Sequence, residues 1–138
     1  MADTGYNWDT SWTEEFSGTL TQGGTTDDTS AAISLKGKAA VAISVDADYS
    51  NHAKATGGLF VHICRDINGG DFEVEADGPW SFEMPFTQAG TNRQTFVLDA
   101  MAFGPSFKIY LDWDNSTSSA AVTVVTNYKF ATIPAASA

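Results

Sequence analysis

Short stretches in which apolar and polar residues alternate recur along this chain and limit the folds that it can adopt. In the stretch Phe107-Lys108-Ile109-Tyr110-Leu111-Asp112-Trp113-Asp114 the odd positions are apolar, and three of the even positions are polar. Successive side chains of a strand point to opposite faces of a sheet, so this period predicts a strand with one face in a core. No helical period persists over a window of about 11 residues.

The alternation predicts roughly eight or nine strands, about 8–14 residues apart and separated by polar turns. Regular short strands of this kind are typical of an all-β fold, and we expect a single-domain antiparallel β-sandwich that is jelly-roll-like. A length of 138 residues fits one domain. The expected organisation is an extended N-terminal arm (1–15), the β-sandwich (16–130) and a C-terminal tail (131–138).

Three local predictions depend on turn chemistry. Residues 23–28 are polar and are expected to form a loop, and a short strand is expected over 31–35. The Asn68-Gly69 pair predicts a tight hairpin turn, because these residues tolerate the positive φ angles that such a turn requires. A strand with Phe72, Val74 and Ala76 on its inner face is expected to follow that turn.

Charge and composition exclude several classes of function. Seven basic and 17 acidic residues give a net charge of −10, which disfavours direct binding to nucleic acid. The first residues carry neither the basic region nor the apolar run of a signal peptide, and no apolar run is long enough to span a membrane. A single cysteine, Cys64, permits no intramolecular disulfide. We therefore expect a protein made in a reducing cytoplasm, without a membrane partner.

The strongest candidate for catalysis is a cysteine–histidine pair. His62 and Cys64 are two residues apart on one expected strand and share a face, whereas His52 lies in a polar loop. Nothing nearby in the sequence resembles an orienting group or an oxyanion hole, so we expect packing roles and no catalytic residue.

Two groups of acidic residues are candidates for metal binding or acid–base chemistry. Oxygen ligands gather at the end of an expected strand, and two further aspartates share the outward face of another: Asp112, Asp114, Asn115 and Ser116, with Asp46 and Asp48. Asp and Asn also begin turns by bonding their own backbone, so neither a metal site nor a cofactor is expected. Paired carboxylates are offered by Glu73, Glu75, Asp77 and Glu83, for which a solvated strand face is the expected role.

Aromatic residues supply the candidate binding site. Trp80 and Trp113 fall on the inward parity of their strands and are expected in the core. Tyr6, Trp8 and Trp12 lie in the turn-rich arm outside any strand pattern. They either fold back over the core or anchor on a partner, where Trp and Tyr are typical hot-spot residues. A stacking platform for a sugar is a third interpretation.

One strand is apolar on both faces, which bears on self-association. Phe60, His62 and Cys64 lie opposite an inward set that comprises Leu59, Val61 and Ile63. Because one sandwich covers only one face of a strand, the second face predicts a homo-oligomer, and a trimer is the expected form.

Three stretches of the chain resemble small β-rich virion proteins of bacteriophages: Val61–Asp71, Phe107–Thr117 and Val122–Phe130. The resemblance implies a non-enzymatic viral structural protein, located in the virion and homo-oligomeric. It implies a capsid decoration (cement) protein that binds the major capsid protein or another virion protein and stabilises the shell. The alternatives are a carbohydrate-binding module and a tail-associated protein of host attachment.

Overall fold

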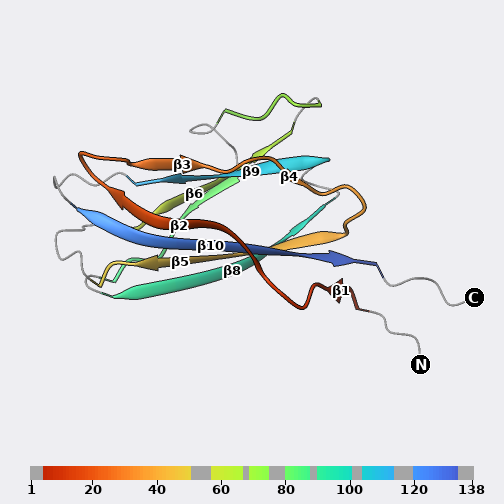
Figure 1. Ribbon diagram of the computed structural model, residues 1–138, viewed down its shortest axis with the longest axis horizontal. Helices are drawn as coiled ribbons and strands as arrows, with labels where there is room; N and C mark the ends of the chain where they lie inside the picture. The colour runs from red at the N-terminus through yellow and green to blue at the C-terminus, as the bar shows by residue number, and fades with distance from the viewer. Residues whose placement is uncertain are drawn as a thin grey trace, which may run out of the picture.

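The computed structural model describes residues 5–50, 57–66, 69–74, 80–87, 90–100, 104–113 and 120–133. Within these ranges the chain forms strands and no helix, and all the strand pairs are antiparallel. The strands build two sheets, which lie one above the other in Figure 1. The expected all-β sandwich is confirmed.

The first sheet contains five strands: β1 (Asn7–Trp8), β2 (Thr13–Thr21), β5 (Ala40–Asp48), β8 (Thr91–Asp99) and β10 (Ala121–Thr132). β10 is its central strand and pairs on one side with β5, which pairs in turn with β8. On its other side β10 pairs first with β2 and, near its C-terminal end, with β1.

The second sheet also contains five strands: β3 (Asp27–Thr29), β4 (Ile33–Ser34), β6 (Phe60–Arg65), β7 (Trp80–Glu83) and β9 (Ser106–Asp112). β9 pairs on one side with β6, which pairs with β7, and on the other side with β3 and β4.

The order of the strands identifies the topology. With β3 and β4 counted as one interrupted strand and β1 as part of the arm, eight strands remain. In chain order they lie first-eighth-third-sixth in one sheet and second-seventh-fourth-fifth in the other. This is the strand order of a jelly roll, in which two Greek keys form the two sheets. The jelly-roll expectation is therefore confirmed.

The core lies between the sheets and follows the alternation of the sequence. The inward residues of the central strands are buried: Val41, Ile43, Val45 and Ala47 of β5, and Phe107, Ile109 and Leu111 of β9. Two large rings close one end of the core, where Tyr49 and Trp113 stack with centroids 5.9 Å apart. Both have a bonded polar atom: the Tyr49 hydroxyl accepts the Leu59 amide at 3.1 Å, and Trp113 Nε1 donates to the Ala120 carbonyl at 3.0 Å.

Strand boundaries differ in places from those expected. Residues 27–29 belong to β3 and not to a loop, and the strand expected over 31–35 is only the two residues of β4. β3 is a polar edge strand that pairs through its backbone with the end of β9, so no apolar alternation marks it. At the ends, β2 begins at Thr13 and β10 continues to Thr132.

The chain reverses direction after β6, although Asn68 of the predicted turn lies outside the described residues, and the strand expected after the turn is wrong for the residues described. Gly69 and Gly70 adopt φ values of 68° and 117°, and an isolated bridge joins Asp66 to Phe72. Val74, which was expected to face inward, is 67% exposed, and Ala76 lies outside the described residues. The partner of β6 on this side is β7, so residues 69–74 are not needed to extend the sheet.

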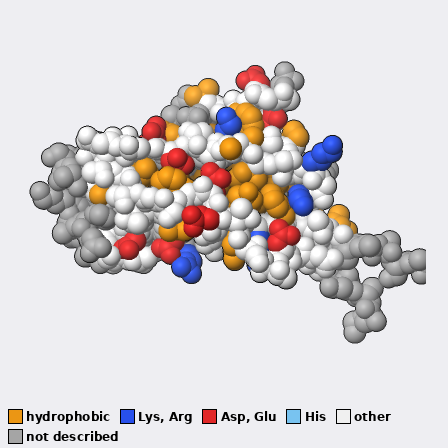
Figure 2. Space-filling view, in the orientation of Figure 1, with side chains coloured by type: hydrophobic (Ala, Val, Ile, Leu, Met, Phe, Trp, Pro, Cys, Tyr) orange, Lys and Arg blue, Asp and Glu red, His pale blue; other side chains and the backbone are white. Residues whose placement is uncertain are grey.

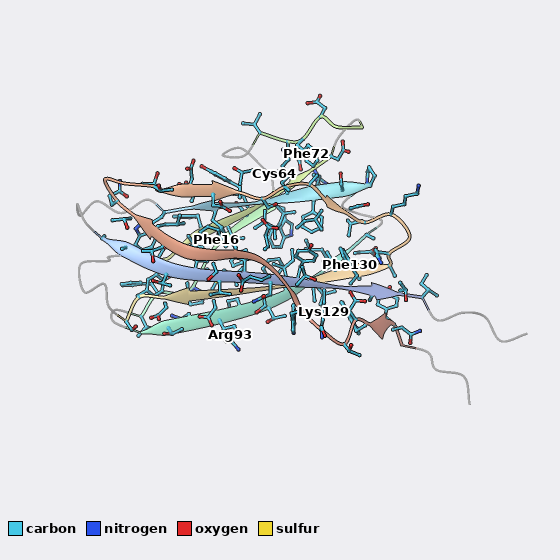
Figure 3. All side chains as sticks on the ribbon, viewed as in Figure 1. Phe16, Cys64, Phe72, Arg93, Lys129 and Phe130 are labelled. Carbon is cyan, nitrogen blue, oxygen red and sulfur yellow. The ribbon has the colours of Figure 1, made fainter. Side chains whose placement is uncertain are left out.

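Residues 69–74 are instead held beside β6 by an ion pair. Glu73 accepts the Arg65 Nε at 2.8 Å, the Arg65 Nη2 at 3.0 Å and the Arg65 backbone amide at 2.9 Å. Lys108, which pairs with Cys64, extends its ammonium to 4.5 Å from the centre of the Phe72 ring. Figure 3 shows Phe72 and Cys64 close together at this face.

This arrangement removes the reason for expecting a trimer. Cys64 is fully buried and His62 is only 9% exposed in a single chain, so the second face of β6 at these residues needs no other copy to cover it. The same chain covers the second face of β6 at Cys64 and His62, whereas the expected trimer required that face to be open in a single chain.

We expect the Glu73→Gln substitution to lower the free energy of unfolding by about 1–2 kcal/mol at pH 7. The hydrogen bonds from Arg65 lower the pKa of Glu73 in the folded protein. The carboxylate therefore contributes stability above its ordinary pKa of 4.5, and this contribution is lost as the pH falls through the lower folded value. Denaturant unfolding over a pH series measures the difference, which should shrink in acid. Glu14→Gln, at an exposed residue, serves as a control. Equal stability of the two variants at pH 7 would contradict a stabilising role of the Arg65–Glu73 ion pair.

Candidate partner-binding surface

The backbone of the N-terminal arm is fixed to the first sheet. β1 pairs with the end of β10, Asn7 with Thr132 and Trp8 with Ala131. The Asp9 amide donates to the Phe130 carbonyl at 2.8 Å, and the Phe130 amide donates to Asp9 Oδ2 at 3.0 Å. In its described residues, the arm is therefore a short edge strand of its own domain.

The side chains of the arm remain accessible to different degrees. Trp8 is half-buried, whereas Tyr6 is 49% and Trp12 is 41% exposed. Lys129 of β10, labelled in Figure 3, places its ammonium 4.7 Å from the Trp12 ring centre and 5.9 Å from that of Trp8. A cation over an aromatic face favours one orientation of each ring. The arm therefore has features of both interpretations. Its backbone folds back onto the first sheet, and the rings of Tyr6 and Trp12 stay available to a partner.

A pocket of ≈ 320 Å³ opens beside Trp12 on the outer face of the first sheet. It is lined by Trp12, Ser44, Asp46, Arg93, Val125 and Asn127. Arg93 Nη2 lies 2.8 Å from Asp46 Oδ2, and this ion pair orients both planar groups beside the ring. The pocket therefore combines an aromatic face with amide, hydroxyl, carboxylate and guanidinium groups.

A second, more apolar pocket of ≈ 270 Å³ lies where the edges of the two sheets meet, at β7 and β8. Trp80, Phe82 and Phe96 form its walls, with ring centroids 5.0–5.6 Å apart. All three are half-buried and pack against the core. The sequence placed Trp80 in the core with Trp113, and this is confirmed for Trp113, which is 1% exposed. The alternation of residues along the strand predicted that the Trp80 side chain points inward, but it did not predict that Trp80 lies at the open edge of the sandwich.

On the opposite side of the sandwich, Figure 2 shows hydrophobic side chains gathered between the two sheets, with acidic and basic groups around them. Phe16 and Phe130, labelled in Figure 3, are among the half-buried rings that pack against the core there. Lys38 covers Phe130 with its ammonium 5.0 Å from the ring centre. This side is therefore closed in part by the edge strands and by a lysine stem.

Among the residues that the structure describes, the candidate catalytic and metal-binding side chains do not form a site. Cys64 is buried without access to solvent, and the His62 ring packs 5.5 Å from that of Tyr110. Glu83 accepts the Gly58 amide at 3.0 Å, and Glu73 is bound by Arg65. Within the described ranges, no three His, Cys, Asp or Glu side chains are grouped as metal ligands. Several candidates lie outside those ranges: His52, Glu75, Asp77, Asp114, Asn115 and Ser116.

A small acidic cluster lies where β2 approaches β3. Burial and the neighbouring charge of Asp28 raise the pKa of Glu15, and burial and Asp27 raise the pKa of Asp28. Because these folded pKa values exceed the ordinary ones, the ionised groups oppose folding at neutral pH, and stability from this source rises as the pH falls. Tyr110 relieves part of the repulsion by donating from its hydroxyl to Asp27 Oδ2 at 3.3 Å.

Comparison with known proteins leaves the family open. No family model matches the sequence, and no curated protein matches it. Among solved structures, the chain is similar to a chain of an empty virus-like particle of cowpea mosaic virus, with a TM-score of 0.45 and 11% sequence identity. The match covers 94% of this chain and 88% of that chain. No helix in the part of the chain described here is long and apolar enough to cross a membrane.

Proposed function

We propose that this protein is a non-enzymatic structural component of a virus particle, and more specifically a bacteriophage capsid decoration (cement) protein. It binds the major capsid protein on the outer surface of the shell. The observation that carries the proposal is the arm: its backbone is fixed to β10, while Tyr6 and Trp12 are 49% and 41% exposed. Aromatic rings presented on a fixed backbone lose little entropy on binding and are typical interface anchors.

An anchor of this kind would stabilise the shell if it binds where shell subunits meet. A jelly roll attached at the boundary between shell subunits adds binding energy that exists only in the assembled shell, so it stabilises that state by mass action. The resemblance of three stretches of the sequence to phage virion proteins supports the same role. Self-association remains part of the proposal, although the face that predicted a trimer is covered within one chain at Cys64 and His62.

The test is co-sedimentation of the purified protein with capsids assembled from the major capsid protein of the same genome. We expect saturable binding, and we expect the combined Tyr6→Ala and Trp12→Ala substitutions to weaken it by on the order of 100-fold or more. Substitution is preferable to deletion of the arm, because deletion would also remove β1 from β10. Val74→Ala, at a 67% exposed residue beside the other sheet, is the control and should bind normally. Unchanged binding by the double variant would contradict the anchor.

The pocket beside Trp12 favours a second candidate function, a carbohydrate-binding module that serves in host attachment, for example on a phage tail. Its exposed ring and the oriented Asp46–Arg93 pair offer stacking and paired hydrogen bonds, which sugars require. A glycan array separates the two functions. Binding to a defined glycan that Asp46→Ala abolishes would favour this candidate over the decoration protein.

A further inference from the structure

The two sheets present edges of very different kinds. β3, β4 and β7 are only three, two and four residues long, and the edge formed by β2 carries a register shift before β1 replaces it. β8 has nine residues in unbroken register with β5 and contains no proline. Within the described ranges no strand pairs with its second edge, which is the lower edge of the first sheet in Figure 1. Long regular edges without such interruptions are templates for pairing with another strand.

The hydrogen bonds around β8 fix which of its backbone groups face that edge. The Ala100 amide donates to the Ala39 carbonyl at 3.0 Å, and the Tyr49 amide donates to the Gly90 carbonyl at 2.8 Å. In an antiparallel ladder these pairs alternate along the strand, so the even-numbered residues of β8 direct their backbone groups toward β5. The odd-numbered residues from Thr91 to Asp99 therefore direct their N–H and C=O groups toward the open edge.

Apolar surface lies beside these backbone groups. Val97 is 58% exposed on the outer face of β8. On the inner face, Phe96 joins Trp80 and Phe82 around the ≈ 270 Å³ pocket, which Gln94 and Thr95 also line. An added strand would thus gain main-chain hydrogen bonds and cover an apolar pocket, the two elements of recognition by strand addition.

The sequence of β8 is complementary to itself when it pairs antiparallel about Phe96. Arg93 then lies opposite Asp99 of the second copy, and Thr95 lies opposite Val97 of the second copy, in both halves of the contact. Every such pair joins residues of the same parity, so inner and outer faces stay aligned. Centring the contact on Thr95 would place Arg93 opposite Val97 and lose the charge match.

We propose that β8 is a two-fold interface at which this protein pairs with a second copy of itself, β8 against β8, centred on Phe96. The pairing joins the first sheets of the two copies into one continuous sheet. Arg93 pairs with Asp46 within its own chain, and in the dimer its guanidinium also faces Asp99 of the second copy. These two contacts between the copies fix the register. The same patch serves both partners, as a two-fold contact requires, so the product is a dimer and not a trimer. The dimer concerns the isolated protein and does not require the proposed attachment to a capsid.

Thr95→Pro is the first test. The Thr95 amide points away from β5, so proline removes a hydrogen bond of the dimer and none of the ladder within the chain. In sedimentation velocity, the apparent mass of the unmodified protein should rise with concentration, from the 14.7 kDa of one chain to twice that value. Thr95→Pro should stay monomeric with an unchanged β-type circular dichroism spectrum, and Thr95→Val should dimerise normally.

Charge exchange tests the register independently of any effect of proline on folding. Asp99→Lys places two cations opposite each other and should weaken dimerisation at least about 10-fold. Adding Arg93→Glu to that variant restores opposite charges between the copies, and Asp46→Asn is added with it because Asp46 would otherwise repel the new carboxylate within the chain. This triple variant should restore the dimer. The proposal is overturned by a monomer or a trimer at all concentrations, by a folded Thr95→Pro dimer, or by a failure of the folded triple variant to recover.

Discussion

Trp113→Ala should lower the free energy of unfolding by about 3–5 kcal/mol and the melting temperature by more than about 10 °C. Trp113 is 1% exposed, stacks on Tyr49 and donates from its indole nitrogen to the Ala120 carbonyl. Alanine would leave a cavity at the end of the core and remove one of the two hydrogen bonds that the Ala120 carbonyl accepts, the other coming from the Gln22 amide at 2.8 Å. Each of these losses costs stability.

Trp12→Ala is the control for the size of the residue removed. Its ring is 41% exposed and lies 4.7 Å from the Lys129 ammonium, so the cost should stay below about 1 kcal/mol. Calorimetric or denaturant unfolding of both variants compares the two tryptophans directly. Equal losses of stability would mean that the alternation of residues 107–113 does not define the core.

The alternation predicted the core well because burial acts on side chains, and their direction along a strand is fixed by the backbone. The inward residues of β5 and β9 are almost all fully buried. Where a strand is held by its backbone alone, no such signal exists. Asp27–Thr29 is polar and forms β3 only because β9 lies beside it, and that neighbour is more than 70 residues away in the chain.

Parity alone cannot tell a covered face from an open one. Cys64 lies on the outward face of β6 and is nevertheless buried, in part because Arg65 and Glu73 hold residues 69–74 nearby. Phe96 lies on the inward face of β8 and is only half-buried, because β8 is an edge strand. The alternation of the sequence therefore carries no signal for the candidate interface on β8.

The arm shows how far composition identifies a site. Tyr6, Trp8 and Trp12 were selected as a candidate site because they are large aromatics among turn-forming residues. Whether they fold back or protrude depends on the end of β10, whose Ala131 and Thr132 were expected in a tail and instead pair with β1. Lys129, which orders two of the rings, carries no signal in the sequence that would associate it with them.

Gly58→Ala should cost about 2–3 kcal/mol, whereas Gly57→Ala should leave stability unchanged or raise it slightly. A Cβ on Gly58 would overlap the Met84 carbonyl oxygen and meet the Glu83 Cγ at 3.1 Å, where the chain before β6 runs against the end of β7. The backbone at this contact has little freedom to move, since the Met84 amide donates to the Leu59 carbonyl at 2.7 Å. A Cβ on Gly57 would meet only the Glu83 carboxylate, at an ordinary contact distance of 3.5 Å. Denaturant unfolding of the two variants measures the contrast, and a Gly58→Ala protein as stable as Gly57→Ala would show that β6 and β7 do not approach this closely.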